Sequence, residues 1–251
     1  MRRMSGGSFI FIIFLVIMAI NRLSAPGMSP MQWLQNTLLL LPAIVIGITF
    51  HEFMHAYSAY KLGDQTPKMQ GRVTLNPLKH IDPVGIVILI FVGFGWGRPV
   101  QVNPYAFKGN LRISNLIVNV AGVGMNLFLA FLFAGLHVAL VYGMQMGQLP
   151  ATDALNVFMN IVFIIVRINL VLMLFNLLPI PPLDGFGIIT EIFDLRRFEW
   201  HRKLYSYGMF ILLALIVVPS LMGFSFIGWL LTPAFTTIPN ALYSIWGAII
   251  F

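Results

Sequence analysis

Residues 38–60 have the sequence LLLLPAIVIGITFHEFMHAYSAY, an apolar run that contains three ionisable side chains, His51, Glu52 and His55. The run is long enough to cross the roughly 30 Å hydrocarbon core of a bilayer as a helix. An ionisable group at that depth costs about 2.5 kcal/mol or more, so such groups usually mark a functional site. The run therefore predicts a membrane helix that carries chemistry.

The composition extends this prediction to the whole chain, because 59% of its 251 residues are hydrophobic and only 9% are charged. A soluble domain has about 45–50% and about 25%, so an ordinary soluble globular protein is excluded. We expect one membrane-embedded domain over residues 1–251, an all-α polytopic membrane protein with about six transmembrane helices. The expected crossings are residues 5–23, 38–60, 112–143, 155–178, 203–222 and 226–250.

A shorter apolar run at residues 84–96 does not reach the usual crossing length, and we expect it to be re-entrant. Thirteen of the fifteen Lys and Arg residues then fall on one side of the membrane. This positive-inside pattern predicts that both termini are cytoplasmic. The net charge of +7 follows from this topology, so the lipid bilayer is the expected partner and no nucleic acid is expected. Residues 72–75 and 99–103 look extended and are expected to pair as a small β element at the cytoplasmic face.

His51, Glu52 and His55 form the motif H-E-x-x-H, which arises by chance in about one chain in a thousand of this composition. The spacing of four residues places both imidazoles on one face of a helix, with Glu52 beside them as a general base. The chain has no cysteine, so His and carboxylates are the strong metal ligands that remain. The motif predicts a zinc hydrolase site about 9–15 Å below the cytoplasmic boundary at Lys61.

A catalytic zinc usually has three protein ligands, so the motif lacks one. Most of the eight carboxylates lie in charged loops, at helix ends or on the external side, and Asp184 is the main candidate left. It lies in a proline-rich stretch, residues 176–185, at the cytoplasmic end of the fourth expected crossing. His80 and Asp82 are the alternative ligands, and a simple turn or helix-capping role is the alternative for Asp184.

With these motifs, the chain resembles the site-2 protease family of intramembrane zinc metalloproteases, in the short prokaryotic form without PDZ or CBS domains. The resemblance rests on H-E-x-x-H, on the segment N-x-x-P-x-P-x-x-D-G from Asn176, and on the stretches 71–77 and 80–85. It implies that His51, His55 and Asp184 bind one zinc ion per chain and that Glu52 is the catalytic base.

The resemblance also implies that Asn176 lies close to the active site, where it contacts substrate or helps to stabilise the oxyanion. Family members often have A-G-P-x-x-N in the third crossing, whereas this chain has A-G-V-G-M-N at residues 121–126, so a similar role for Asn126 is less firmly indicated.

The implied activity is hydrolysis of peptide bonds within or near the transmembrane segments of membrane proteins. The implied location is a prokaryotic plasma membrane, with the active site toward the cytoplasm. Two other classes stay open, a metal or ion transporter and an inactive metal-binding scaffold. Two more polar residues lie in apolar runs: His137 is expected near the external headgroups, and Arg167 is expected to have a structural partner or to assist substrate access.

Overall fold

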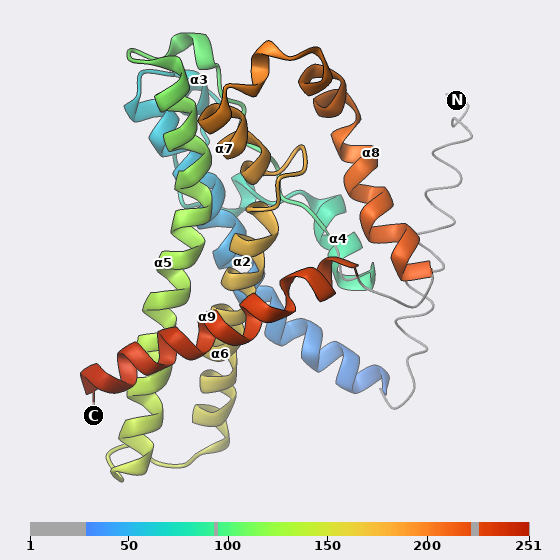
Figure 1. The fold of residues 1–251 in the computed structure, drawn as a ribbon. Coiled ribbons are helices and arrows are strands. Elements are labelled where there is room, and N and C mark those ends of the chain that lie inside the picture. The colour runs from blue at the N-terminus through green and yellow to red at the C-terminus, as the bar shows by residue number, and fades with distance from the viewer. Residues whose placement is uncertain (1–28, 93–94, 222–225, 251) are drawn as a thin grey trace.

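Helices form nearly all the regular structure in the part of the chain that the computed structural model describes, residues 29–92, 95–221 and 226–250 (Figure 1). The long helices are α2 (Pro30–Lys61), α5 (Leu111–Gln145), α6 (Asp153–Asn176), α8 (Glu199–Leu221) and α9 (Phe226–Ile250). Shorter ones are α3 (Thr66–Met69), α4 (Pro83–Val92) and α7 (Asp184–Phe193), with the 3-10 turns η1 (Pro77–Lys79), η2 (Pro104–Ala106) and η3 (Leu195–Arg197).

Three of the described helices, α2, α5 and α6, are long and apolar enough to cross a membrane. They correspond to the expected crossings at 38–60, 112–143 and 155–178. Helices α8 and α9 occupy the next two expected ranges but are not among these three, so six crossings stay a prediction. The crossing expected at residues 5–23 lies outside the described residues. At about 1.5 Å per residue, α4 is only about 15 Å long, too short to cross.

The three membrane-length helices begin at side chains that cap their free N–H groups. Ser29 starts α2 with a capping box, in which its hydroxyl accepts from Gln32 N–H and the Gln32 side chain accepts from Ser29 N–H. The side chains of Asn110 and Thr152 cap α5 and α6 more simply, by accepting from backbone N–H groups in the first turn of each helix. Because the cap fixes where α2 begins, this helix starts eight residues before its expected first residue.

The hydrophobic core lies between α5, α6 and α9, which crosses over the other two, and α2 packs against α5 and α6 (Figure 1). Small residues bring the helix backbones close together, as in many membrane bundles. Ala130 and Ala134 are fully buried, and a Cβ on Gly47 of α2 would lie 2.6 Å from Leu172 of α6. Helix α2 is thus packed closely against α6 and also contacts α5, which matters for the site below.

The small β element is not confirmed, because the described residues contain no strand and only one isolated bridge, between Ile81 and Gly97. The two expected pieces do lie together, but side chains join them. The Arg72 guanidinium donates to the carbonyls of Arg98 and Pro99, and Val100 N–H donates to Glu52 instead of a neighbouring strand. Pro99 has no backbone N–H to donate, so it interrupts the hydrogen bonds that would pair residues 99–103 with residues 72–75 as strands.

Candidate metal centre

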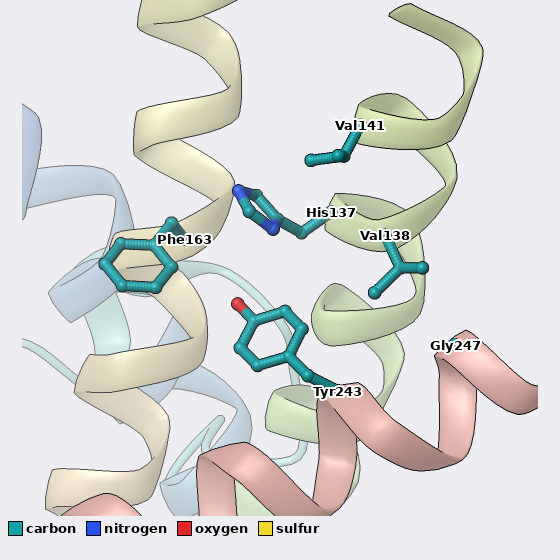
Figure 2. Close-up of a pocket in the computed structure, with 6 residues that line it drawn as sticks. All are labelled: His137, Val138, Val141, Phe163, Tyr243 and Gly247. Atoms are coloured by element: carbon teal, nitrogen blue, oxygen red, sulfur yellow. The ribbon is translucent and has the colours of Figure 1, made fainter. Parts of the chain in front are cut away.

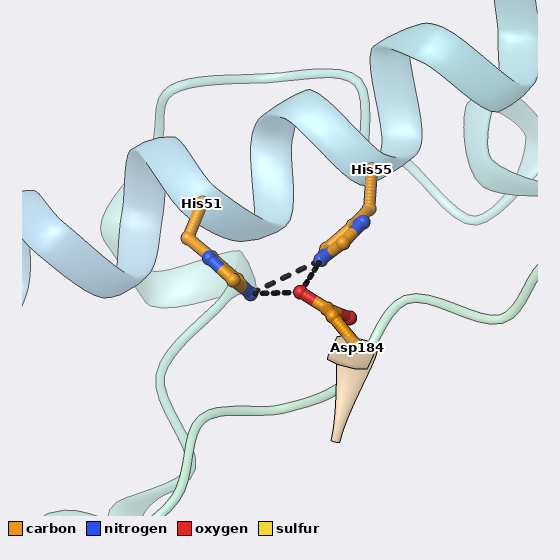
Figure 3. A group of neighbouring side chains, drawn as sticks. All are labelled: His51, His55 and Asp184. Atoms are coloured by element: carbon orange, nitrogen blue, oxygen red, sulfur yellow. Dashed lines mark hydrogen bonds and ion pairs between the residues drawn. The ribbon is translucent and has the colours of Figure 1, made fainter. Parts of the chain in front are cut away.

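His51 and His55 lie one turn apart on the buried face of α2, 7% and 8% exposed (Figure 3). Their Nε2 atoms point toward each other and lie 3.0 Å apart. This is the arrangement that the i, i+4 spacing predicts, since residues four apart in a helix are neighbours on its surface.

Asp184 is the first residue of α7, and its carboxylate points at both imidazoles (Figure 3). Its Oδ2 lies 3.3 Å from His51 Nε2 and 3.2 Å from His55 Nε2. The chain reaches this place by a tight turn after α6, where a Cβ on Gly185 would lie 2.2 Å from the Leu177 carbonyl oxygen. Only glycine fits there, so the end of α6 and the start of α7 are held together.

The hydrogen bonds of the other imidazole nitrogens fix both histidine tautomers. His55 Nδ1 lies 2.8 Å from the Val118 carbonyl oxygen, which can only accept, so Nδ1 carries the proton. His51 Nδ1 lies 2.7 Å from Asn126 Oδ1, and the Asn126 amide nitrogen already donates to Gly47 and Asn169. His51 Nδ1 is therefore also the donor, and both Nε2 atoms present lone pairs.

These three atoms fit a zinc ion. Two imidazole lone pairs and a carboxylate oxygen meet within 4.8 Å of one another, and without a cation they would repel. Zinc–nitrogen bonds are about 2.0–2.1 Å and zinc–oxygen bonds about 2.0–2.2 Å, so a tetrahedral site places its ligand atoms roughly 3.3–3.5 Å apart. The observed distances of 3.0, 3.2 and 3.3 Å lie within about 0.3 Å of that range. The described residues supply three ligands, which leaves a fourth position for water or substrate.

Gly122 brings the backbone of α5 against the metal centre. A Cβ at this position would lie 2.3 Å from His55 Nε2 and 2.8 Å from His51 Cε1. Since real side chains do not approach so closely, glycine is required here for α5 to contact both imidazoles. Helix α5 therefore closes one side of the centre.

Glu52 projects from α2 beside His51, and its Oε2 accepts a hydrogen bond of 3.0 Å from Val100 N–H. The guanidinium of Arg72 lies 3.8 Å from the same oxygen. No hydrogen bond to Oε1 occurs among the described residues. One carboxylate oxygen is thus held by the protein, and the other is available for proton transfer.

The two alternative ligands lie elsewhere in their loop. His80 is completely buried, and its Nε2 donates to the Thr74 carbonyl oxygen at 2.7 Å, while burial lowers the pKa of its imidazole. Asp82 Oδ1 accepts from Gly85 N–H at the start of α4. Both residues therefore have structural partners, and neither joins the cluster of His51, His55 and Asp184.

The two asparagines differ in their surroundings. Asn126 is fully buried and uses both amide hydrogens on Gly47 and Asn169, so it orients His51 and has no donor left for an oxyanion in this arrangement. Asn176 donates to the Leu172 carbonyl of its own helix, and its expected contact with substrate stays a prediction.

His137 and Arg167 lie away from the metal centre. His137 lines a cavity of about 350 Å³ between α5, α6 and α9, where its ring contacts Phe163 and Tyr243 (Figure 2). The Arg167 guanidinium lies 5.9 Å from the centre of the Phe163 ring, one helical turn away. The face of the Phe163 ring is thus a structural partner for Arg167, which was one of its two expected roles, and the other role, in substrate access, stays a prediction.

Sequence reasoning did not single out Asn169 or Gly122, although both help to build the site. The available signal was a polar or small residue inside an apolar run, and this signal does not show which helix face it lies on. Arg72 was placed in an extended piece, without any link to Glu52. In each case the missing information was which helices and loops are neighbours.

Comparison with known proteins agrees with this geometry. The family description "Peptidase family M50" matches residues 138–218, which include Asp184. YwhC of Bacillus subtilis (strain 168), provisionally named as a zinc metalloprotease, is 44% identical over 193 residues, or 75% of this chain and 86% of YwhC. The chain belongs to peptidase family M50, the site-2 protease family.

Other M50 relatives are more distant. Rip2 of Mycolicibacterium smegmatis, also provisionally named as a zinc metalloprotease, is 27% identical over 83% of this chain and 81% of Rip2. Rip2 of Mycobacterium tuberculosis (strain H37Rv) is 26% identical over 83% of this chain and 78% of its own length. No solved structure matches the chain significantly. Family membership and these names support a site-2 protease-like metalloprotease, a hydrolase that uses zinc.

Proposed function

We propose that this M50 metalloprotease hydrolyses peptide bonds within or near transmembrane segments of membrane protein substrates. One observation carries the proposal. The imidazole lone pairs of two histidines on α2, a helix of membrane-spanning length, meet the carboxylate of Asp184 from α7. The two histidines lie six to ten residues before the end of α2 at Lys61, or about 9–15 Å along the helix. That depth favours substrates that are themselves embedded in the membrane.

In the proposed reaction, His51, His55 and Asp184 hold one zinc ion per chain. A zinc ion there would supply Lewis-acid polarisation of the scissile carbonyl and would acidify the attacking water. Glu52 accepts a proton from that water through its free Oε1 and later delivers it to the leaving amine. Asn176 remains the residue proposed to contact the substrate or its oxyanion.

The orientation in the membrane is part of the same proposal. Helices of membrane-spanning length and membership of the M50 family indicate a membrane protein. The distribution of Lys and Arg supports several crossings and cytoplasmic termini, and the resemblance to the short prokaryotic form supports a plasma membrane location. The substrate is a transmembrane protein or peptide, and the bilayer is the surrounding solvent.

The test is zinc content and cleavage measured on the same detergent-purified samples. We expect close to one zinc per chain in the wild type and in Glu52→Gln, and much less in His55→Ala and Asp184→Ala. Chelator-sensitive cleavage of a reporter protein with one transmembrane helix is expected from the wild type alone. Zinc binding with cleavage by none of the samples would favour a scaffold or a transporter, and a wild type that binds no zinc would refute the metal site.

A further inference from the structure

We propose that Arg72 is a positioning residue for the catalytic base, holding residues 98–100 on Glu52 so that Oε2 is engaged and Oε1 stays free. The inference rests on the proposed function, because it takes Glu52 to be the base. It concerns a side chain outside the H-E-x-x-H motif, on a loop that follows α3.

Arg72 is only 6% exposed, although it lies in a loop between α3 and η1. Its backbone N–H donates to the Pro67 carbonyl oxygen at 2.8 Å, which fixes the start of the side chain. A buried arginine is costly unless its charge and its N–H groups have partners, so this burial calls for a specific role.

Three acceptors surround the guanidinium, and two of them belong to the segment that covers Glu52. The guanidinium donates to the carbonyl oxygens of Arg98 and Pro99, and one of its nitrogens lies 3.8 Å from Glu52 Oε2. The next residue, Val100, then places its N–H 3.0 Å from that same oxygen. Arg72 thus acts on Glu52 in two ways. Its charge attracts the Glu52 carboxylate directly, and its hydrogen bonds to residues 98 and 99 hold in place the Val100 N–H that donates to Glu52.

The loop around Arg72 is tied together by further hydrogen bonds. Arg98 N–H donates to the His80 carbonyl oxygen at 2.7 Å, and the His80 ring donates to Thr74. Gly97 lies against α2, where a Cβ would be 2.7 Å from Ile48 Cγ2 and 3.9 Å from Glu52 Oε1. The segment therefore rests directly on the face of α2 that carries the base.

An arginine suits this position because its planar fork can donate to two carbonyls while it remains close to a carboxylate. Lysine carries the same charge on a single nitrogen, so it cannot make the same set of contacts. Removal of Arg72 should leave the three metal ligands in place but free the 98–100 segment, and with it the Glu52 carboxylate.

Arg72→Met tests the inference, with Arg98→Met as the matched control. The control also removes one positive charge, but the Arg98 side chain is exposed and its backbone carbonyl remains. Arg72→Lys is the second variant, which keeps the charge if the loss of Arg72 impairs folding. All three are made in the full-length protein and compared with the wild type in the same detergent.

Two measurements need no substrate. Amide hydrogen exchange at Val100 is expected to be at least 10-fold faster in Arg72→Met and unchanged in Arg98→Met. The chain has only three glutamates, so ¹³C NMR of the labelled carboxyl groups can follow Glu52, assigned by Glu52→Gln. Its signal should shift in Arg72→Met and in Arg72→Lys, while the signal of Glu199 stays in place. A loss of fold alone would not move the Glu52 signal selectively.

Turnover of the single-helix reporter gives the third measurement. We expect kcat to fall at least 10-fold in Arg72→Met, with zinc content and KM close to those of the wild type, and no rescue by lysine. Unchanged exchange at Val100 and an unchanged Glu52 signal would overturn the inference, as would full activity in Arg72→Met. If the wild type binds zinc but cleaves nothing while the exchange and NMR changes occur, the proposed function fails and the positioning of Glu52 stands.

Discussion

Substitution of Gly122 by alanine should break the metal centre through one methyl group. The new Cβ would lie 2.3 Å from His55 Nε2, 2.6 Å from His55 Cε1 and 2.8 Å from His51 Cε1. Ordinary contact begins at 3.4 Å, so the His55 ring or helix α5 must move by about 1 Å. Metal–ligand distances tolerate only about 0.2 Å, so the three ligand atoms can no longer converge.

We expect zinc affinity to fall at least 100-fold. Loss of a residue that only supports a metal ligand typically lowers metal affinity 10–100-fold, and here the ligand itself is displaced. Competition with a chromogenic chelator measures it directly in detergent. Gly124→Ala is the matched control, because Gly124 is two residues further along the same helix and no atom of the described residues lies within 4 Å of its added Cβ. Alanine favours helix by about 1 kcal/mol over glycine, so the control should melt at the same or a slightly higher temperature.

Zinc affinity in Gly122→Ala within threefold of the wild type would refute this account of the site. Such a result would mean that α5 does not contact the imidazoles, or that His51 and His55 are not the ligands. The thermal transition of the metal-free variant separates a local effect from a failure to fold. We expect that transition to lie within a few degrees of the metal-free wild type.

Three further perturbations test other contacts. Asn126→Leu leaves the His51 Nδ1–H without an acceptor, so unfolding free energy should fall by about 1–3 kcal/mol and zinc affinity by about 10–100-fold, measured by denaturation and chelator competition. His80 has a folded-state pKa below its ordinary value, so its contribution to stability is complete above pH 6.5 and is lost as pH falls toward the lower value. Melting temperatures from pH 7.5 to 5 should show this decline, and His80→Gln should flatten it. Tyr243 has a buried hydroxyl with no hydrogen-bond partner among the described residues, so Tyr243→Phe should leave the melting temperature unchanged or raise it slightly, and a large drop would contradict this account of the hydroxyl.

Much of the geometry of the candidate metal centre follows from local spacing, and for that reason the sequence could predict which side chains lie together. The i, i+4 pair in H-E-x-x-H defines one helix face whatever the rest of the fold does. Asp184 followed from the scarcity of carboxylates near the cytoplasmic end of an apolar helix, and the structure does bring it to both histidines.

Contacts between distant segments were beyond the same reasoning. Whether Asn126 faces the substrate or His51 depends on the rotation of α5 about its axis relative to α2. A membrane helix is apolar on its lipid-facing side as well as on its protein-facing side, so its sequence does not show this rotation clearly. The expected β pairing failed for a related reason. Val100 N–H has a better acceptor in Glu52, 48 residues away in sequence, than in a neighbouring strand.

The distance along the chain between the histidines and Asp184 has a consequence for biosynthesis. His55 emerges from the ribosome 129 residues before Asp184, and at about 5–20 residues per second that gap lasts roughly 6–26 s. During this interval the nascent chain has two of its three ligands and the base, but it does not yet have the turn that starts α7. On the proposed function, the centre is therefore incomplete until α5, α6 and the start of α7 have been synthesised, and no cleavage by a nascent chain is expected before then.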